Sequence, residues 1–273
     1  MLEYSVKANG RLWLIGGTVE SSQLAAAIAR SHLPCTISVT TETARSLYPD
    51  VPYLQVWVGT LDLPGMAQFL QAQEIVAVLD ASHPFAVDVS RNAIAVCTQY
   101  QIPYLRYQRP SLEVECGIGG EWENSQKIIH FGSISNLVTG DYLQGERVLL
   151  TLGYKALPLF RPWQERSTLF ARILPATTSI EAAKAAGFKP DRLFAMRPPI
   201  SADLERALWR HWQISMVVTK ASGASGGEDI KRMVADELGV SLVIIDPPAI
   251  DYPQVTSNLS EAISFCQQYL SQN

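Results

Sequence analysis

The sequence has few of the features that mark disulfide-rich, metal-binding or membrane proteins. Only four cysteines occur in 273 residues, and Cys35, Cys97, Cys116 and Cys266 form no C-x-x-C pair and no Cys/His ligand spacing. We interpret them as buried free thiols and predict no metal site. No apolar run approaches the ~20 residues of a transmembrane helix, and residues 1–10 lack the apolar core of a signal peptide. We therefore expect a cytoplasmic protein without membrane partners.

An excess of positive charge is also lacking. The chain has 22 Lys and Arg against 26 Asp and Glu, a net charge of −4, and no basic stripe interleaved with aromatic residues. This pattern argues against nucleic-acid binding, so an anionic ligand must be met by local clusters of Arg and Lys. With 273 residues, 47% of them hydrophobic, the chain is long enough for two globular domains. A monomer or weak oligomer is expected.

The first strand-turn-helix pattern is the centre of the sequence. An apolar run over residues 12–15 enters Gly16 and Gly17, after which apolar residues recur at helical spacing. Such glycines let a backbone approach an anion, and the first N–H groups of the helix point at it. The hydroxyls of Thr18, Ser21 and Ser22 are expected to add donors. The spacing is not the full G-x-G-x-x-G, so an ordinary strand-to-helix turn is the alternative.

Alternating strand and helix patterns predict two parallel sheets. The predicted strands are residues 12–15, 36–40, 54–58, 75–80, 103–107, 147–152, 169–174, 192–196, 215–219 and 241–246. Repeated βα units predict an α/β fold with two Rossmann-like parallel-sheet domains. Because the pattern is lost over residues 108–130, we predict domains 1–130 and 131–273, with a ligand cleft between them. The sequence of the last helix assigns it to neither half.

The end of the second predicted strand bears on the choice of cofactor. In a dinucleotide fold, an acid about 20 positions past the glycines accepts the ribose hydroxyls of NAD, whereas an Arg accommodates the 2′-phosphate of NADP. Thr40 and Arg45 therefore favour NADP, and Glu42 is the competing NAD-like residue. A solvated surface arginine is the alternative for Arg45.

The fourth predicted strand ends in Asp80-Ala81-Ser82-His83-Pro84-Phe85-Ala86. Sites in open α/β sheets lie at the carboxyl ends of strands, which puts this segment at the rim of a site. His83 is a candidate proton donor or substrate contact, and a hydrogen bond near the helix start is the alternative. No G-x-S-x-G elbow surrounds Ser82, so an acyl-transfer triad is disfavoured.

Two strand ends in the second half carry further polar residues. Thr151–Lys155 follows one strand, and Thr219–Glu228 closes another. The small residues and hydroxyls after Lys220 predict a second anion-accepting nest, with a flexible surface loop as the alternative. Lys220 precedes the glycines, whereas G-x-x-x-x-G-K-[ST] places lysine after them, so NTP hydrolysis is disfavoured.

Taken in order, these motifs resemble those of the precorrin-6A reductase family, which includes the cobalt-precorrin-6A reductases. The resemblance covers nearly the whole chain and is carried by Gly16-Gly17-Thr18-Val19-Glu20, Asp80–Ala86, Arg106 with Arg109-Pro110, Thr151-Leu152-Gly153, and Thr219-Lys220 with Ser222-Gly223. The chain departs from the family pattern at Arg197-Pro198-Pro199, where Gly-Pro-Phe is common, and at the inserted Ala224-Ser225-Gly226.

The resemblance implies an NADPH-dependent reduction of one double bond in a carboxylate-rich tetrapyrrole, a corrin precursor of cobalamin biosynthesis. The main task of such a protein is to position the two reacting carbons, with one proton delivered after the hydride. The implied contacts of NADPH are Gly16, Gly17, Thr18, Glu20, Ser21, Thr40, Arg45 and Ser82. The implied contacts of the substrate are Arg106, Arg109, Lys155, Ser222 and Gly223, with Arg91, Arg172 and Arg197 as further candidate cations. His83 or Lys220 is the implied proton donor, and solvent is the alternative.

The sequence can be compared with two other functions. A short-chain dehydrogenase would need Tyr-x-x-x-Lys, and no tyrosine here has a lysine four positions later. An NADP-sensing module would bind the cofactor without oxidising it when a corrin precursor is supplied. Turnover therefore distinguishes the sensor from the reductase.

Overall fold

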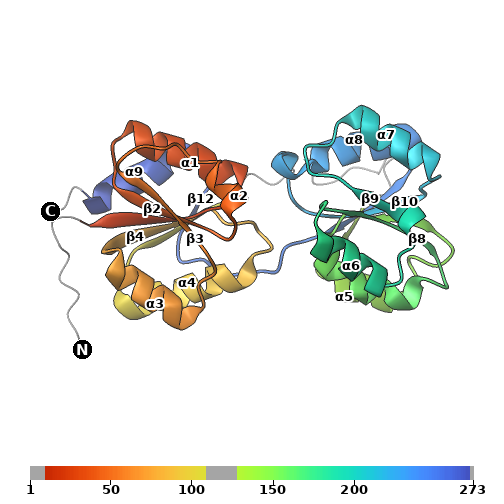
Figure 1. The fold of residues 1–273 in the computed structure, drawn as a ribbon, viewed down its shortest axis with the longest axis horizontal. Coiled ribbons are helices and arrows are strands. Elements are labelled where there is room, and N and C mark those ends of the chain that lie inside the picture. The colour runs from red at the N-terminus through yellow and green to blue at the C-terminus, as the bar shows by residue number, and fades with distance from the viewer. Residues whose placement is uncertain (1–9, 109–127, 271–273) are drawn as a thin grey trace, which may run out of the picture. The chain divides into compact units, whose positions relative to one another are not determined.

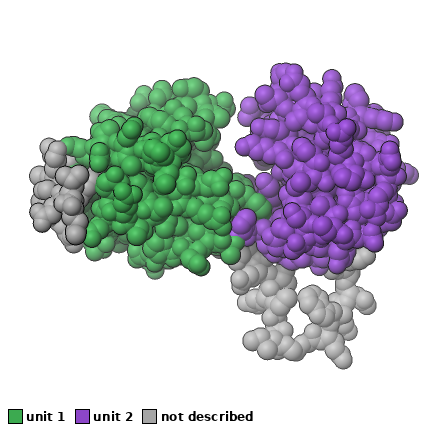
Figure 2. Space-filling model, turned by 90° about the horizontal axis from the view of Figure 1, so that it is seen from below, with its two compact units in different colours: residues 1–110, 249–273 green, residues 111–248 purple. Residues whose placement is uncertain are grey.

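The structure is a computed structural model that describes residues 10–108 and 128–270 (Figure 1). The chain divides into two compact units, coloured separately in Figure 2. Unit 1 comprises residues 1–110 and 249–273, and unit 2 comprises residues 111–248. Each unit is built on a six-stranded parallel sheet.

The sheet of unit 1 has the strand order β3-β2-β1-β4-β5-β12. Its strands are β1 (Arg11–Ile15), β2 (Cys35–Val39), β3 (Leu54–Val58), β4 (Ile75–Asp80), β5 (Tyr104–Tyr107) and β12 (Val255–Thr256). This is the 3-2-1-4-5-6 order of doubly wound dinucleotide-binding sheets. The order reverses between β1 and β4, which brings the glycine turn beside the loop after Asp80.

Helices cover both faces of this sheet (Figure 1). They are α1 (Val19–Arg30) and α9 (Leu259–Leu270) on one face, α3 (Leu63–Ala72) and α4 (Val87–Tyr100) on the other, and the short α2 (Glu42–Arg45) after β2. The apolar stripe of α9, which includes Ala262 and Cys266, packs in the same core as Leu24 and Ile28 of α1. The last helix therefore belongs to unit 1.

The sheet of unit 2 has the order β9-β8-β7-β10-β11-β6. Its strands are β6 (Ile128–Phe131), β7 (Arg147–Leu150), β8 (Thr168–Ile173), β9 (Leu193–Ala195), β10 (Met216–Lys220) and β11 (Ser241–Ile245). The connecting helices are α5 (Ile134–Thr139), α6 (Thr177–Ala185), α7 (Ala202–His211) and α8 (Glu228–Leu238), with 3₁₀ turns η1 (Tyr154–Trp163), η2 (Pro190–Arg192) and η3 (Ala224–Gly226). The first five positions repeat the order of unit 1, and the order reverses between β7 and β10.

The predicted fold class of two parallel α/β sheets is confirmed, but the predicted domain boundary is wrong. Residues 249–273 return to unit 1, and β6 joins the sheet of unit 2 although it begins before residue 131. Each sheet takes its sixth strand from outside its own βα series, and the pattern along the chain does not reveal such long-range pairing. The predicted cleft between the two halves stays a prediction.

Among the described residues, no helix has both the length and the apolar character needed to cross a membrane.

Candidate functional site

The glycine turn between β1 and α1 has the geometry of an anion-binding turn. Gly17 is exposed and has φ of +99°, a conformation that favours glycine, and a Cβ built on it would meet nothing within 4 Å. Thr18 caps α1 by accepting from the N–H of Ser21 at 3.1 Å, and Ser21 Oγ accepts from the N–H of Thr18 at 3.0 Å. The turn therefore opens to solvent at the positive end of a twelve-residue helix.

The three hydroxyls that were predicted to donate to a ligand donate within the protein instead. Thr18 Oγ1 donates to the carbonyl of Ala81 at 2.8 Å, and Ser21 Oγ donates to the carbonyl of Thr18 at 2.7 Å. Ser22 Oγ donates to the carbonyl of Leu47 at 2.7 Å. A hydroxyl has one proton, and the N–H groups of Gly17, Thr18 and Ser21 are paired as well. Anion attraction at this turn therefore rests on the positive end of the α1 dipole.

Tyr48 contacts the glycine turn, and sequence reasoning missed it. The N–H of Gly17 donates to Tyr48 Oη at 2.6 Å, and Tyr48 Oη lies 2.8 Å from Ser21 Oγ. A Cβ on Gly16 would lie 2.4 Å from Tyr48 Oη, so the first glycine makes room for the phenol. Tyr48 is buried, and burial raises its pKa above the usual tyrosine value. Tyr48 lies beyond α2, and no local pattern singles it out.

Thr40 directly follows β2, and Arg45 is the last residue of the short helix α2 that comes next; both are exposed. The guanidinium of Arg45 donates to the carbonyl of Val56 at 3.0 Å and lies 3.8 Å from the carboxylate of Glu42. Both side chains of this pair are more than half exposed, so the pair is weak. Because Arg has five N–H donors, Arg45 retains the capacity to bind an incoming phosphate.

Asp80, at the end of β4, is fully buried and accepts four hydrogen bonds. Its Oδ1 accepts from Arg106 Nη1 and from the N–H of Ser82, both at 2.9 Å. Its Oδ2 accepts from Ser90 Oγ at 2.6 Å and from Tyr104 Oη at 2.5 Å. Burial and then the charge of Asp80 raise the pKa of Tyr104, so the phenol stays a donor. The buried carboxylate is thus paired and hydrogen-bonded, as a buried charge requires.

Arg106 differs from its predicted role as a substrate contact. Its side chain is 2% exposed and, besides Asp80, it donates to Ser82 Oγ at 3.0 Å and to the carbonyl of Ser82 at 2.9 Å. Asp80 and Arg106 are register partners on adjacent strands, so their side chains share one face of the sheet. We therefore assign Arg106 to bracing the turn after β4. Ser82, predicted to contact the cofactor, is buried in the same network.

His83 follows this braced turn and is exposed. Its Nδ1 accepts from the N–H of Phe85 at 3.2 Å, and the two rings lie 5.9 Å apart. The local bond matches the alternative considered for His83, a contact near the helix start. Its exposure at the carboxyl edge of the sheet is also compatible with proton transfer, so that role stays a prediction.

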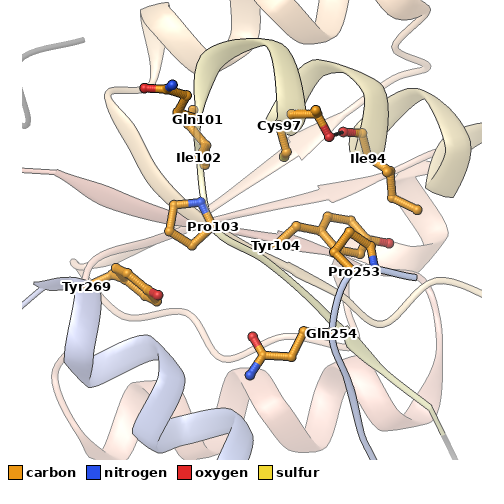
Figure 3. A pocket seen from close by; sticks show the side chains of 10 residues that line it. Ile94, Cys97, Gln101, Ile102, Pro103, Tyr104, Pro253, Gln254 and Tyr269 are labelled. Carbon is orange, nitrogen blue, oxygen red and sulfur yellow. Dashed lines mark hydrogen bonds between the residues drawn. The ribbon is translucent and has the colours of Figure 1, made fainter. Parts of the chain in front are cut away.

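A pocket of about 420 Å³ lies elsewhere in unit 1 (Figure 3). Pro103 and Tyr104, at the amino end of β5, line it together with Cys97 of α4 and Tyr269 of α9. Ligands of open α/β sheets bind at the carboxyl ends of the strands, so we do not assign this pocket to the cofactor. Burial raises the pKa of the Cys97 thiol to about 12, which leaves it unreactive.

The carboxyl edge of the unit 2 sheet carries a pair of cations. Lys220 ends β10, and Lys155 follows the adjacent strand β7, so both belong to the point where the strand order reverses. Burial and then the nearby charge of Lys155 lower the pKa of Lys220. The structure thus brings together two of the predicted site residues. Such a pair attracts a carboxylate, and a lowered pKa suits lysine to proton transfer.

The predicted nest after Lys220 is formed, but a side chain of the protein occupies it. The N–H groups of Ser222 and Gly223 both donate to Glu228 Oε2 at 2.9 Å. Glu228 Oε1 accepts from Arg232 at 2.9 Å, and the ammonium of Lys231 donates to the carbonyl of Gly227 at 2.8 Å. The N–H groups of Ser222 and Gly223 are thus already paired, and their predicted contact with substrate stays a prediction. The sequence feature that indicates the bond to Glu228 is the presence of this acidic residue in the first turn of α8.

Comparison with known proteins identifies the family. Residues 11–267 match the family described as precorrin-6x reductase CbiJ/CobK. The chain belongs to this family. It is 42% identical to the cobalt-precorrin-6A reductase of Synechocystis sp. over 259 residues, which cover 95% of this chain and 97% of that protein. It is 31% identical to the cobalt-precorrin-6A reductase of Salmonella typhimurium, with 95% of each chain covered.

A solved structure supports the fold of this CbiJ/CobK family member. The structure named CobK precorrin-6A reductase superposes with a TM-score of 0.75 at 24% identity, covering 95% of this chain and 97% of that chain. The resemblance inferred from the motifs is therefore confirmed at the level of family and fold.

The remaining predicted cations of this family member differ in exposure and in their contacts. Arg109 lies outside the described residues. Arg172 forms an ion pair with the buried Glu205, so its charge is committed within the protein. Arg91 and Arg197 are exposed. Among the predicted basic residues, Lys155 and Lys220 are thus the two that the described structure brings together.

Proposed function

We propose that the protein catalyses the NADPH-dependent reduction of one double bond in the precorrin-6A macrocycle, with or without cobalt, as a step of cobalamin biosynthesis. The observation that carries this proposal is the family match over residues 11–267. The relatives from Synechocystis sp. and Salmonella typhimurium are both named cobalt-precorrin-6A reductase, which favours the cobalt-bearing substrate.

The residues of unit 1 fit a dinucleotide. The open space beside Gly17 admits a pyrophosphate, and the positive end of α1 stabilises its charge. Arg45, at the end of the short helix α2 that follows the neighbouring strand, is suited to the 2′-phosphate that distinguishes NADPH from NADH. Bound NADPH would supply the hydride.

The residues of unit 2 fit an anionic substrate. Lys155 and Lys220 offer two adjacent positive charges to the carboxylates of the macrocycle. Reduction of a double bond adds a hydride to one carbon and a proton to its neighbour. Lys220 is our candidate donor of that proton because its lowered pKa makes it a stronger acid than an ordinary lysine. His83 of unit 1 is the second candidate.

The experiment is a turnover assay. Purified protein, NADPH and either precorrin-6A or cobalt-precorrin-6A should consume one NADPH per macrocycle and shift the absorption of the conjugated ring. NADPH without a macrocycle should not be oxidised. Binding of NADPH without oxidation in the presence of both macrocycles would reject the reductase in favour of an NADP-sensing module.

A further inference from the structure

Three hydrogen bonds connect the segment of residues 40–48, which carries Arg45, to neighbouring elements of unit 1. Arg45 donates to the carbonyl of Val56 in β3 at 3.0 Å. Leu47 accepts from Ser22 Oγ of α1 at 2.7 Å. Tyr48 Oη accepts from the N–H of Gly17 at 2.6 Å. Two of these bonds reach the glycine turn and the start of α1, although the residues they join are 25 and 31 positions apart.

The hydroxyl of Tyr48 is both a donor and an acceptor in this arrangement. Ser21 Oγ gives its own proton to the carbonyl of Thr18 at 2.7 Å. In the 2.8 Å contact between Ser21 Oγ and Tyr48 Oη, the phenol is therefore the donor. The same oxygen accepts from the N–H of Gly17. The Tyr48 hydroxyl thus bridges the N–H of Gly17 and Ser21 Oγ in the first turn of α1 by two hydrogen bonds.

The buried ring of Tyr48 holds its hydroxyl in place. Tyr48 is 8% exposed and packs in the core cluster that contains Ile37 and Val39 of β2. The N–H of Tyr48 donates to the carbonyl of Arg45 at 3.2 Å. One residue therefore connects the backbone of Arg45 to the peptide of Gly17, whereas the side chain of Arg45 itself is 57% exposed.

We propose that Tyr48 is a specificity-determining positioning residue that holds Arg45 at a fixed distance from the glycine turn. The inference rests on the proposed function, in which Gly17 faces the pyrophosphate and Arg45 faces the 2′-phosphate. A ligand that carries both groups gains from two contacts that are already in place, because no ordering of the loop opposes binding. NADH lacks the 2′-phosphate and gains nothing from the position of Arg45.

The test is the Tyr48→Phe variant, which removes the hydroxyl and keeps the buried ring. Dissociation constants for NADPH and NADH would be measured by nucleotide fluorescence. We expect NADPH to bind about five- to tenfold more weakly, the equivalent of one lost hydrogen bond, and NADH to change by less than about twofold. In the Arg45→Ala background, Tyr48→Phe should have no further effect on NADPH, because the contact that it positions is gone.

Tyr53→Phe is the matched control. Tyr53 Oη donates to the carbonyl of Ala29 at 2.8 Å and packs against the same core, but it has no bond to the turn. We expect this variant to keep the cofactor preference of the wild type.

Equal weakening of both cofactors by Tyr48→Phe, or an unchanged preference, would overturn the inference and leave the proposed function standing. Tighter binding of both cofactors would also overturn it, because Tyr48 would then be an obstacle. A wild-type protein that does not bind NADPH would overturn both proposals.

Discussion

Asp80 and Arg106 form a fully buried ion pair, with Nη1 and Oδ1 2.9 Å apart and both side chains at most 2% exposed. The pair joins the carboxyl ends of β4 and β5 and fixes the turn that precedes His83. Both side chains are buried, although both residues lie in segments that carry the family resemblance.

Loss of the charge of Asp80 should therefore destabilise the fold. Asp80→Asn keeps the shape of the side chain but leaves the guanidinium of Arg106 buried without its counter-charge. We expect the free energy of unfolding to fall by about 3–5 kcal/mol, measured by urea denaturation. The double variant Asp80→Asn/Arg106→Gln should lose less than the sum of the two single variants. Additive losses would show that the pair is not coupled.

Gly16→Ala tests the contact between the glycine turn and Tyr48. The new methyl would lie 2.4 Å from Tyr48 Oη, and we expect a loss of about 1–3 kcal/mol in unfolding free energy, as for other overpacked sites. Adding Tyr48→Phe should recover part of this loss, because the clashing oxygen is removed. Gly17→Ala is the control. Its cost comes from a φ of +99°, so Tyr48→Phe should not relieve it. Thermal or urea unfolding of the four variants measures these differences.

Arg45→Ala tests the choice of cofactor. If Arg45 binds the 2′-phosphate, the variant should weaken NADPH by about 1.5–3 kcal/mol, the range of a charge-assisted hydrogen bond, and leave NADH nearly unchanged. Arg30→Ala, an exposed arginine in the last turn of α1, is the matched control and should alter neither cofactor. An equal loss for NADPH and NADH would remove the assignment of Arg45.

Glu228→Ala tests how much the carboxylate bound in the nest of unit 2 stabilises the fold. Its carboxylate is 4% exposed and holds the N–H groups of Ser222 and Gly223 as well as Arg232. Glu228→Ala removes the buried carboxylate that accepts from these donors, and we expect it to lower the unfolding free energy by about 2–4 kcal/mol. Glu237→Ala breaks an exposed pair with Arg206 and should cost much less. A stable Glu228→Ala protein that binds the macrocycle more tightly would instead mean that Glu228 competes with a substrate carboxylate.

The positions of most elements follow from the sequence because they depend on local patterns. All ten strands that the apolar runs predict are present, each within two residues of its predicted ends. The two missed strands are β6 and β12, of four and two residues. Such short strands have no clear period, and they become strands because each pairs with the open edge of a sheet.

The site was harder to predict because its bonds join distant residues. The motifs indicated that Gly17, Arg45, Lys155 and Lys220 lie at the ends of strands β1, β2, β7 and β10 or in the segments that follow them, and the structure has them there. They did not reveal that the phenol of Tyr48 would reach Gly17 or that Glu228 would occupy the nest after Lys220. A motif shows which residues lie near a site, but which donors and acceptors are already satisfied depends on the packed structure.

Lys155→Met tests whether Lys220 delivers the proton. Burial and the charge of Lys155 both lower the pKa of Lys220, so its acidic form is lost at a lower pH than that of an ordinary lysine. Removing the neighbouring charge should raise that pKa. If Lys220 is the donor, the basic limb of the profile of kcat against pH should therefore move to higher pH in Lys155→Met.

The value of KM and the position of the basic limb separate two roles of the lysine pair. Lys155→Met should also raise KM, because one cation facing the carboxylates is lost. Lys184→Met, an exposed lysine in the last turn of α6, is the control and should change neither quantity. A raised KM with an unmoved basic limb would restrict Lys155 and Lys220 to substrate binding. In that case His83→Ala becomes the decisive variant, since a loss of kcat without a change in unfolding free energy would assign the proton to His83.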